Sequence, residues 1–313
     1  MAWTVLTQVF ILSLMILLGY ILGKIGFIGK EHSRFLTDLV MDVFFPCNIL
    51  AAAGSGLGED GGGLGTALFV IFLYFALLVV YTILGYLLGG ILRFPDDQRR
   101  AFACSVGYPN NGFMGLPLCA AVFGTRGVVW GSLGIPGATV YIFAVLSPLF
   151  QRSRSESTKE KLKSLVTPLN LSVLAMIIMM IAGLKLVGPL QKVCSTFGAC
   201  NTPVAMLLVG YLLSESPLID TLRRPAVYLV TLCRNLLFPL LAALVLSCTF
   251  LNREMCLCMT MQIGCSVGAT VSIFATRYGR APEYSSQSML QSTLLLPLTM
   301  PVMMFVAERI LLK

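Results

Sequence analysis

The chain has 313 residues, of which 57% are hydrophobic and only 12% are charged, and its mean hydropathy is +0.87. A soluble domain normally carries about 25% charged residues, so this composition excludes a water-soluble enzyme and a disordered chain. The net charge is +8, but the basic residues are spread over short connections, which argues against nucleic-acid binding. The sequence therefore predicts a polytopic, all-α membrane protein.

The apolar runs predict about ten membrane-spanning helices, since each span needs roughly 20 apolar residues and a short connection. Runs such as 66–90 are apolar on all sides and far longer than a barrel strand, which excludes a transmembrane β-barrel. The first run continues to Gly23 without a basic start, which indicates a span and not a cleaved signal peptide. We place the spans at 4–23, 32–53, 65–92, 98–123, 127–150, 167–187, 192–213, 225–250, 254–277 and 284–311.

A polar segment at 151–164 (QRSRSESTKEKLKS) divides the chain into two halves of five spans each. We expect a first five-helix repeat at 1–150, a cytoplasmic linker at 151–165 and a second repeat at 166–313. Because each half has an odd number of spans, the second half enters the membrane in the opposite orientation. Inverted repeats of this kind are typical of transporters, with the substrate near mid-membrane where the repeats meet. The glycine-rich stretch at 54–65 is expected to be a flexible turn.

Basic residues are distributed unequally between the two sides of this topology. Fifteen Lys and Arg residues fall in the connections of one side and six on the other. The side with the excess is expected to be cytoplasmic. Both termini are then predicted to lie outside the cell.

The strongest local signal lies in the fourth span, 98–123, between Pro109 and Pro117. Prolines remove backbone donors and, with the neighbouring glycines, make an uninterrupted helix unfavourable. A break directs a half-helix N-terminus, with its partial positive charge, to mid-membrane, where it suits an anion. Asn110 and Asn111, followed by Gly112, add side-chain donors and acceptors. The alternative is a kinked helix whose amides are satisfied by neighbours.

The ninth span, 254–277, corresponds to the fourth by repeat symmetry. Gly264 and Gly268 stand among small hydroxyl residues there, with no proline. The segment is either unwound, like the fourth span, or a continuous helix whose small residues pack closely against a neighbour.

Ionisable residues inside the spans are few. Asp42 lies clearly within the second span, and Asp38 lies one turn nearer the cytoplasm on the same face. Asn48 is on the same side as Asp42, near a kink at Pro46. An acid within the membrane is a functional candidate because burying its charge is costly, for example as a group that couples transport to protons. The alternative is a structural partner for an arginine or a backbone amide.

Arg234 is the lone cation in the middle of a span. It either attracts a carboxylate substrate or lies at the membrane interface with its charge in water. His32 lies at the membrane edge and is expected to be solvated. The ten cysteines form no CxxC pair, so no metal site is expected. The chain also lacks P-loop, HExxH and GxSxG motifs, so we expect neither an enzyme nor a bound cofactor.

The sequence resembles a known family. The run Pro109-Asn110-Asn111-Gly112-Phe113-Met114-Gly115-Leu116-Pro117 is similar to the fourth-span signature of the auxin efflux carrier family, which includes plant PIN auxin exporters and bacterial malate/malonate permeases. Supporting matches are Phe45-Pro46, Pro203 with Leu208-Val209-Gly210, Arg234 with Pro239, 274–279, 291–295 and Pro301. The resemblance covers essentially the whole chain.

The resemblance implies ten spans in two inverted repeats, with helices 4 and 9 crossing as broken helices. In relatives, helices 1, 2, 6 and 7 form a scaffold that also makes a homodimer, and helices 3–5 and 8–10 form a transport domain that moves like an elevator. The substrate carboxylate then sits at the crossing. One departure is Ser266, where relatives usually have a proline, which implies a softer bend in the ninth span.

These observations together predict a carrier of small organic anions in a bacterial-type plasma membrane, with the lipid bilayer and a second copy of the chain as partners. The residues expected to bind substrate are Asn110, Asn111, Gly112, Asn48, Ser266 and Thr270. The residues expected to break the helices are Pro109, Pro117, Gly264 and Gly268, and those expected to couple charge or protons are Asp42, Asp38 and Arg234. The alternatives are a transporter-like sensor that binds without moving its ligand, and a channel. A sensor should carry a signalling domain, and this chain ends at Lys313 directly after the tenth span.

Overall fold

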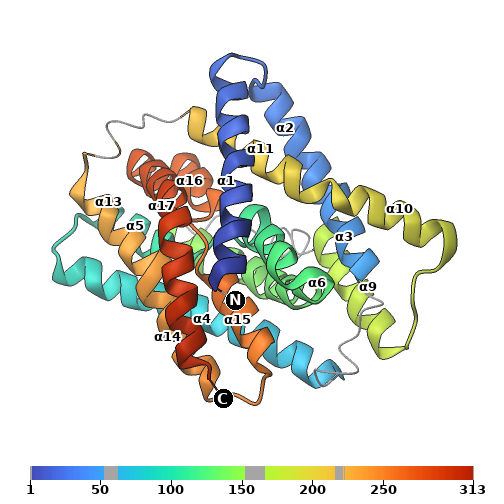
Figure 1. Cartoon of the computed structure of the whole chain (residues 1–313). Helices are drawn as coiled ribbons and strands as arrows, with labels where there is room; N and C mark the ends of the chain where they lie inside the picture. Colours follow the sequence, from blue (N-terminus) through green and yellow to red (C-terminus); the bar gives the residue numbers. More distant parts are fainter. Residues whose placement is uncertain (1, 53–62, 152–165, 216–220, 222, 313) are drawn as a thin grey trace.

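A computed structural model describes residues 2–52, 63–151, 166–215, 221 and 223–312. These residues are helical apart from short connections and one isolated β-bridge (Figure 1). The predicted turn at 54–65 and the linker at 151–165 fall almost entirely outside the described residues.

The helices follow the predicted spans closely at most boundaries. The first half contains α1 (Ala2–Lys24), α2 (Lys30–Leu39), η1 (Val40–Phe44), α3 (Phe45–Ala52), α4 (Gly63–Ile91), α5 (Asp96–Gly107), η3 (Asn111–Gly115), α6 (Leu116–Tyr141), η4 (Ile142–Leu146) and α7 (Ser147–Phe150). The second half contains α9 (Pro168–Ile181), α10 (Gly188–Ala199), α11 (Asn201–Ser214), α13 (Pro225–Leu232), η5 (Cys233–Leu237), α14 (Phe238–Ser247), α15 (Arg253–Ile263), α16 (Ala269–Tyr278) and α17 (Pro282–Ile310).

Seven helical segments of the described chain are long and apolar enough to cross a membrane. They are Leu6–Lys24, Lys30–Ala52, Gly63–Ile91, Asn111–Phe150, Gly188–Ser214, Pro225–Ser247 and Pro282–Ile310. The prediction of a polytopic helical membrane protein is confirmed at this level. The predicted spans at 98–123 and 254–277 are interrupted, and α9 is short, so the total of ten spans and the inverted repeat stay predictions.

The segment from Asn111 to Phe150 is not one straight helix. Gly124 has a φ of +61° and a ψ of −143°, which is not helical, and it turns the chain between two helical arms. A residue with a Cβ would be strained at this positive φ, which explains the glycine. The turn falls in the gap between the predicted spans 98–123 and 127–150.

Each of the four described π-helical segments precedes a proline by two residues. In each, the residue just before the proline donates its backbone N–H to a carbonyl five residues back, as Phe45 does to Val40. A proline has no N–H, and its ring presses on the carbonyl four residues earlier, so the preceding turn widens. The prolines concerned are Pro46, Pro117, Pro148 and Pro239.

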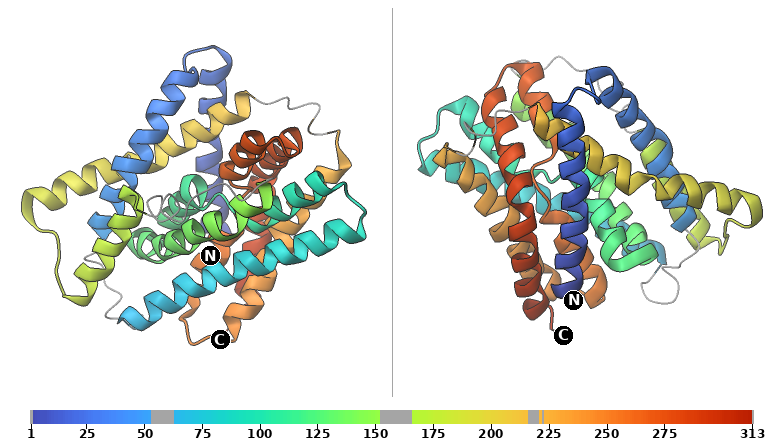
Figure 2. Two further views of the ribbon diagram at one scale, coloured as in Figure 1. Left: turned by 180° about the vertical axis from the view of Figure 1, so that it is seen from behind. Right: turned by 45° about the horizontal axis from the view of Figure 1, so that its top comes forward.

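The helices are arranged around the interrupted segments. In Figure 1, α2, α3, α9 and α10 lie on one side of the molecule, and α5, α13 and α14 lie on the other. The helices α1 and α17 are in contact, and α1 also packs along α11. Seen from behind, the long helix α4 crosses the back of the molecule (Figure 2).

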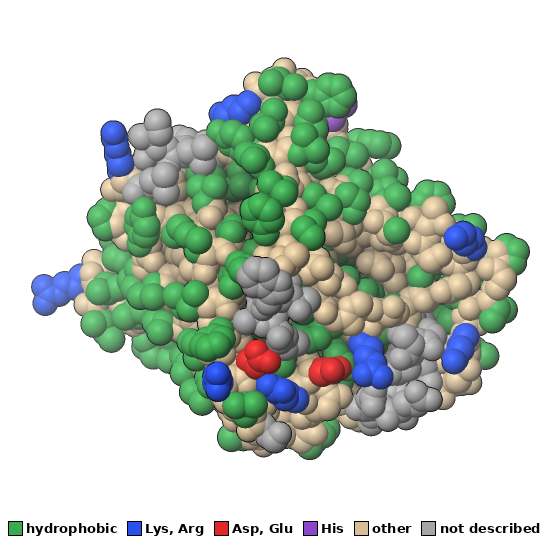
Figure 3. Space-filling model, viewed as in Figure 1, with side chains coloured by type: hydrophobic (Ala, Val, Ile, Leu, Met, Phe, Trp, Pro, Cys, Tyr) green, Lys and Arg blue, Asp and Glu red, His purple; other side chains and the backbone are tan. Residues whose placement is uncertain are grey.

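Large apolar side chains cover much of the surface. Phe10 is 61% exposed, Phe72 is 65% exposed and Leu298 is 70% exposed. Figure 3 shows such side chains spread over one whole face, with the charged side chains few and mostly near its edges. A surface of this kind suits contact with lipid and not with water.

Candidate functional site

The fourth predicted span is broken between α5 and η3. The first half-helix, α5, ends at Gly107, and Tyr108 continues in extended backbone with φ −112° and ψ 111°. The helix restarts at Asn111 and runs without a gap from η3 into α6. The kinked-helix alternative is therefore wrong, because Tyr108, Pro109 and Asn110 leave the helix completely.

The ninth predicted span is broken as well, although it has no proline. Its first half, α15, ends at Ile263, and its second half, α16, begins at Ala269 after extended backbone at Gly268. The alternative of a continuous helix with a small-residue face is wrong. The glycines at 264 and 268 flank the non-helical stretch on both sides.

The two breaks pair with each other. Pro109 and Val267 form an antiparallel β-bridge, in which the amide of Asn110 donates to the carbonyl of Ser266 at 2.7 Å. The amide of Gly268 donates to the carbonyl of Tyr108 at 3.0 Å. Backbone groups freed by each break thus find partners in the other, which is what an environment without water requires.

Close approach explains why residue 268 is a glycine. A Cβ at this position would lie 2.5 Å from Cδ1 of Tyr108 and 2.9 Å from the carbonyl oxygen of Pro109. Real Cβ atoms do not approach other atoms this closely, so only glycine lets the two segments meet. Gly264 is less tightly confined, since the atom nearest to its Cβ, at 2.4 Å, would be the terminal methyl Cε of Met303, a flexible side chain that can move.

The paired breaks, 108–110 and 264–268, are called the crossing from here on. A helix from the second half of the chain binds the crossing from one side. Ser292 of α17 accepts the amide of Val267 on its hydroxyl at 3.0 Å. The backbone carbonyl of Ser292 accepts a hydrogen bond from Nδ2 of Asn235 at 2.9 Å. The crossing is therefore tied to α17 and, through Asn235, to η5.

Arg234 lies next to the crossing and is completely buried. Its Nη1 donates to the carbonyl of Val106 at 2.7 Å, and its Nε donates to the carbonyl of Cys265 at 3.2 Å. The alternative that Arg234 keeps its charge at the membrane interface is wrong. Two of its guanidinium nitrogens donate to backbone carbonyls, so the side chain is hydrogen-bonded directly to both interrupted helices.

A cavity of about 250 Å³ opens beside the crossing. It takes residues from η1, the first break, η3, α6, η4, α9 with the segment before it, and the first turn of α16. Its lining consists of Met41, Asp42, Tyr108, Asn111, Gly112, Ile135, Ala138, Thr139, Ile142, Phe143, Thr167, Leu169 and Thr270. Segments far apart in the sequence thus surround one space with a mixed polar and apolar wall.

Four of the predicted site residues meet at this cavity: Asp42, Asn111, Gly112 and Thr270. Within the part of the chain that the structure describes, the side chains of Asp42 and Asn111 have no hydrogen bond or ion pair. Asn111 is only 6% exposed, so its carboxamide faces the cavity with its donors and acceptor free. A buried amide without a protein partner is well suited to hold a polar ligand.

The other predicted residues lie elsewhere. Asn110 and Ser266 are buried at the bridge, where the Ser266 hydroxyl donates to Sδ of Met114 at 3.2 Å. Asn48 is in α3 and packs against α10, where a Cβ on Gly198 would lie 2.8 Å from its Cα. Asp38 is exposed on α2. None of these four side chains is part of the lining of the cavity.

Three polar residues of the cavity were not singled out from the sequence: Tyr108, Thr139 and Thr167. The hydroxyl of Thr139 donates to the carbonyl of Ile135 at 2.9 Å, and Oδ1 of Asn170 lies 3.3 Å from the same hydroxyl. The sequence feature that could have identified Thr139 is a polar residue within an apolar span. Many threonines that have only a packing role share this feature.

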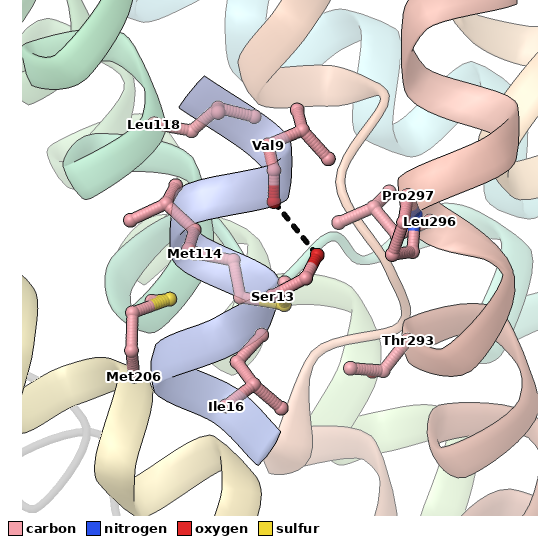
Figure 4. Close-up of a pocket in the computed structure, with 10 residues that line it drawn as sticks. Val9, Ser13, Ile16, Met114, Leu118, Met206, Thr293, Leu296 and Pro297 are labelled. Carbon is pink, nitrogen blue, oxygen red and sulfur yellow. Dashed lines mark hydrogen bonds between the residues drawn. The ribbon is translucent and has the colours of Figure 1, made fainter. Parts of the chain in front are cut away.

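A second cavity lies on another side of η3, between α1, α11 and α17 (Figure 4). It measures about 20 Å³ and includes Met114 and Met206, and a neighbouring, more open groove of about 330 Å³ includes Tyr20. The hydroxyl of Ser13 is already bonded to the carbonyl of Val9 at 2.7 Å, as Figure 4 shows. The lining is almost wholly apolar and offers few polar groups that could orient a ligand.

A polytopic helical membrane protein with two interrupted helices, paired at their breaks beside a cavity of mixed polar and apolar lining, has the architecture of a transporter. The sequence profile described as membrane transport protein matches residues 4–304. The chain belongs to the auxin efflux carrier family, as the motif at 109–117 indicated. Membership of a transport family agrees with the expectation that the protein is not an enzyme.

One relative is an uncharacterized transporter of the archaeon Methanocaldococcus jannaschii. It is similar to this chain, with 25% identity over 217 residues, which cover 67% of this chain and 69% of the relative. Its name agrees with a role in transport but gives no substrate.

Proposed function

We propose that the protein is a secondary carrier for small organic anions, and carboxylates in particular. The observation that carries this proposal is the free carboxamide of Asn111 at the start of a half-helix, inside a cavity of about 250 Å³ that it shares with Thr270. A cavity of this size suits a small molecule and not a macromolecule.

Helix N-termini supply the attraction for an anion. The helix η3–α6 starts at Asn111 and α16 starts at Ala269, so both second half-helices begin at the crossing. Each such end carries roughly half a positive charge from unpaired N–H groups. Together with the Asn111 amide and the Thr270 hydroxyl, these ends favour a carboxylate without a lysine or arginine in the lining.

In this proposal Asp42 links substrate binding to protons. Among the described residues that line it, Asp42 has the one charged side chain. An ionised Asp42 repels an anionic substrate, whereas a protonated Asp42 does not, so binding and protonation should favour each other. Asp38 and Asp42 are both exposed, but only Asp42 is part of the lining, so we assign the coupling role to Asp42.

The remaining parts of the proposal follow from the family. We propose ten spans in two inverted repeats, a scaffold of helices 1, 2, 6 and 7 that forms a homodimer, and an elevator motion of the other helices. The protein would lie in the plasma membrane with both termini outside, as the excess of basic residues on one side indicates.

The proposal is tested by solid-supported-membrane electrophysiology on proteoliposomes. Malate, malonate, succinate and indole-3-acetate are applied in turn, each with and without a proton gradient, and binding is measured in parallel. A saturable current with one of these anions supports the carrier and identifies the substrate class. Binding without current or counterflow exchange would identify a sensor, and current without exchange would identify a channel. The absence of both binding and current would contradict an organic-anion substrate of this kind.

A further inference from the structure

Arg234 has surroundings that are unusual for a charged side chain. It is fully buried in η5, and its described hydrogen bonds go to backbone carbonyls and not to a carboxylate. No ion pair involving Arg234 occurs among the described residues. A buried cation without an ion-pair partner is costly, so these carbonyls must balance its charge in another way.

Both acceptors lie at the ends of first half-helices. Val106 is the penultimate residue of α5, and Cys265 follows the end of α15 by two residues. The C-terminal end of a helix carries roughly half a negative charge from its unpaired carbonyls. One guanidinium therefore meets the negative end of α5 and a carbonyl just beyond the end of α15, and both offer it partial negative charge.

Carbonyls at the ends of interrupted helices are also the groups that hold a coupling Na⁺ in many secondary carriers. We propose that the guanidinium of Arg234 permanently occupies the place of such a cation, so that this carrier stabilises its crossing and binds its anion without Na⁺. The inference builds on the proposed function, because it names how that carrier is coupled. Within the described chain, Nη2 of Arg234 is buried without a hydrogen-bond partner, so the two carbonyls anchor only Nε and Nη1.

The inference predicts what happens when the charge is removed. Arg234→Gln leaves the carbonyls of Val106 and Cys265 facing a space without a cation. A small monovalent cation should then enter and restore the crossing. Arg234→Lys keeps a positive charge at the same place and should need no such ion.

The experiment measures thermal stability without substrate, in Na⁺ and in choline at equal ionic strength. The wild type and Arg234→Lys are expected to melt at the same temperature in both salts. Arg234→Gln is expected to melt several degrees lower in choline and to regain most of the loss in Na⁺. Arg309→Gln, which removes an exposed arginine near the end of α17, is the matched control and should show neither effect.

Several results would overturn the inference. A wild-type protein that is stabilised specifically by Na⁺ would show that the cation place is not filled. An Arg234→Gln variant that is unchanged in choline, or that is destabilised and does not recover in Na⁺, would show that the two carbonyls do not form a cation site. If Arg234→Gln cannot be purified, Arg234→Lys decides: a stable, Na⁺-independent protein supports the role of charge, and failure of both variants contradicts it. Because these readings need no substrate, they remain valid even if no organic anion is transported.

Discussion

The amide of Asn110 donates a hydrogen bond of 2.7 Å to the carbonyl of Ser266, and this bond joins the two interrupted helices at their breaks. Neither residue is part of the cavity lining, although both are polar. Their contribution is to the backbone that positions Asn111 and Thr270, one and four residues further along. The crossing is therefore a structural element that supports the site, and its individual parts can be tested separately.

Asn111→Ala should weaken anion binding by about 10-fold to 100-fold, because a hydrogen bond to a charged group contributes about 1.5–3 kcal/mol. The measurement is the concentration dependence of the current, or of direct binding. The matched control is Asn48→Ala, which removes an intramembrane asparagine that lies outside the cavity and should keep wild-type affinity. Equal loss in both variants would argue against a direct contact between Asn111 and the anion.

Asp42→Asn should remove the dependence of transport on a proton gradient, because the amide cannot exchange a proton. The current at zero gradient is expected to persist. The measurement compares currents with and without an inwardly directed proton gradient. Asp38→Asn, one turn earlier and outside the cavity lining, should keep the wild-type dependence. A proton dependence that survives in Asp42→Asn would assign the coupling to another group.

Gly268→Ala should destabilise the crossing, since its Cβ would lie 2.5 Å from the ring of Tyr108. We expect a loss of about 1–3 kcal/mol, the usual range for an overpacked site, observed as a lower Tm together with reduced transport. Gly65→Ala is the control, because a Cβ there meets nothing within 4 Å and alanine favours the helix. A variant at 268 as stable as wild type would contradict the close approach of the two breaks.

Asp96 gives the protein a defined response to acid. Arg100 donates a hydrogen bond of 2.8 Å to its carboxylate, and this bond lowers the pKa of Asp96 below its usual value. A lowered pKa means that the stabilisation is complete above the ordinary aspartate pKa and is lost as the pH falls through the lowered one. Because Asp96 is exposed, the effect should be small, under about 1 kcal/mol.

The test compares the Tm of wild type and Asp96→Asn between pH 7 and pH 3. Wild type should be slightly more stable from pH 7 to pH 5, and the difference should decrease as the pH falls below the ordinary aspartate pKa. High salt should reduce the difference, since exposed charges are screened. A difference that increases toward acid would contradict the assigned direction.

Much of the fold was predictable because membrane insertion depends on local composition. The length of an apolar run determines whether it can cross a bilayer, and α1, α4 and α17 end within a few residues of their predicted bounds. The break in the fourth span was predictable for a similar reason. Pro109 acts on its own backbone, so its effect does not depend on distant residues. The prediction that Pro117 also breaks the helix was wrong, because Pro117 lies in the first turn of α6 and only widens the turn before it.

The break in the ninth span was not determined by its own sequence. Gly264 and Gly268 fit both a continuous helix and an unwound one. The choice depends on the segment 108–110, which supplies a backbone partner to the freed groups and leaves no room for a Cβ at 268. The tertiary structure also separated Asn111 from Asn48, two polar residues near mid-span that the sequence alone treats alike.

The sequence by itself thus determined that this chain crosses a membrane many times, that its fourth span is interrupted, and that it belongs with transport proteins. Only the tertiary structure decided which polar groups share a cavity, and that Arg234 binds the ends of both half-helices. The physical reason is that insertion and helix breaking depend on neighbouring residues. A binding site and a buried charge, in contrast, depend on groups that lie far apart along the chain and meet only through packing.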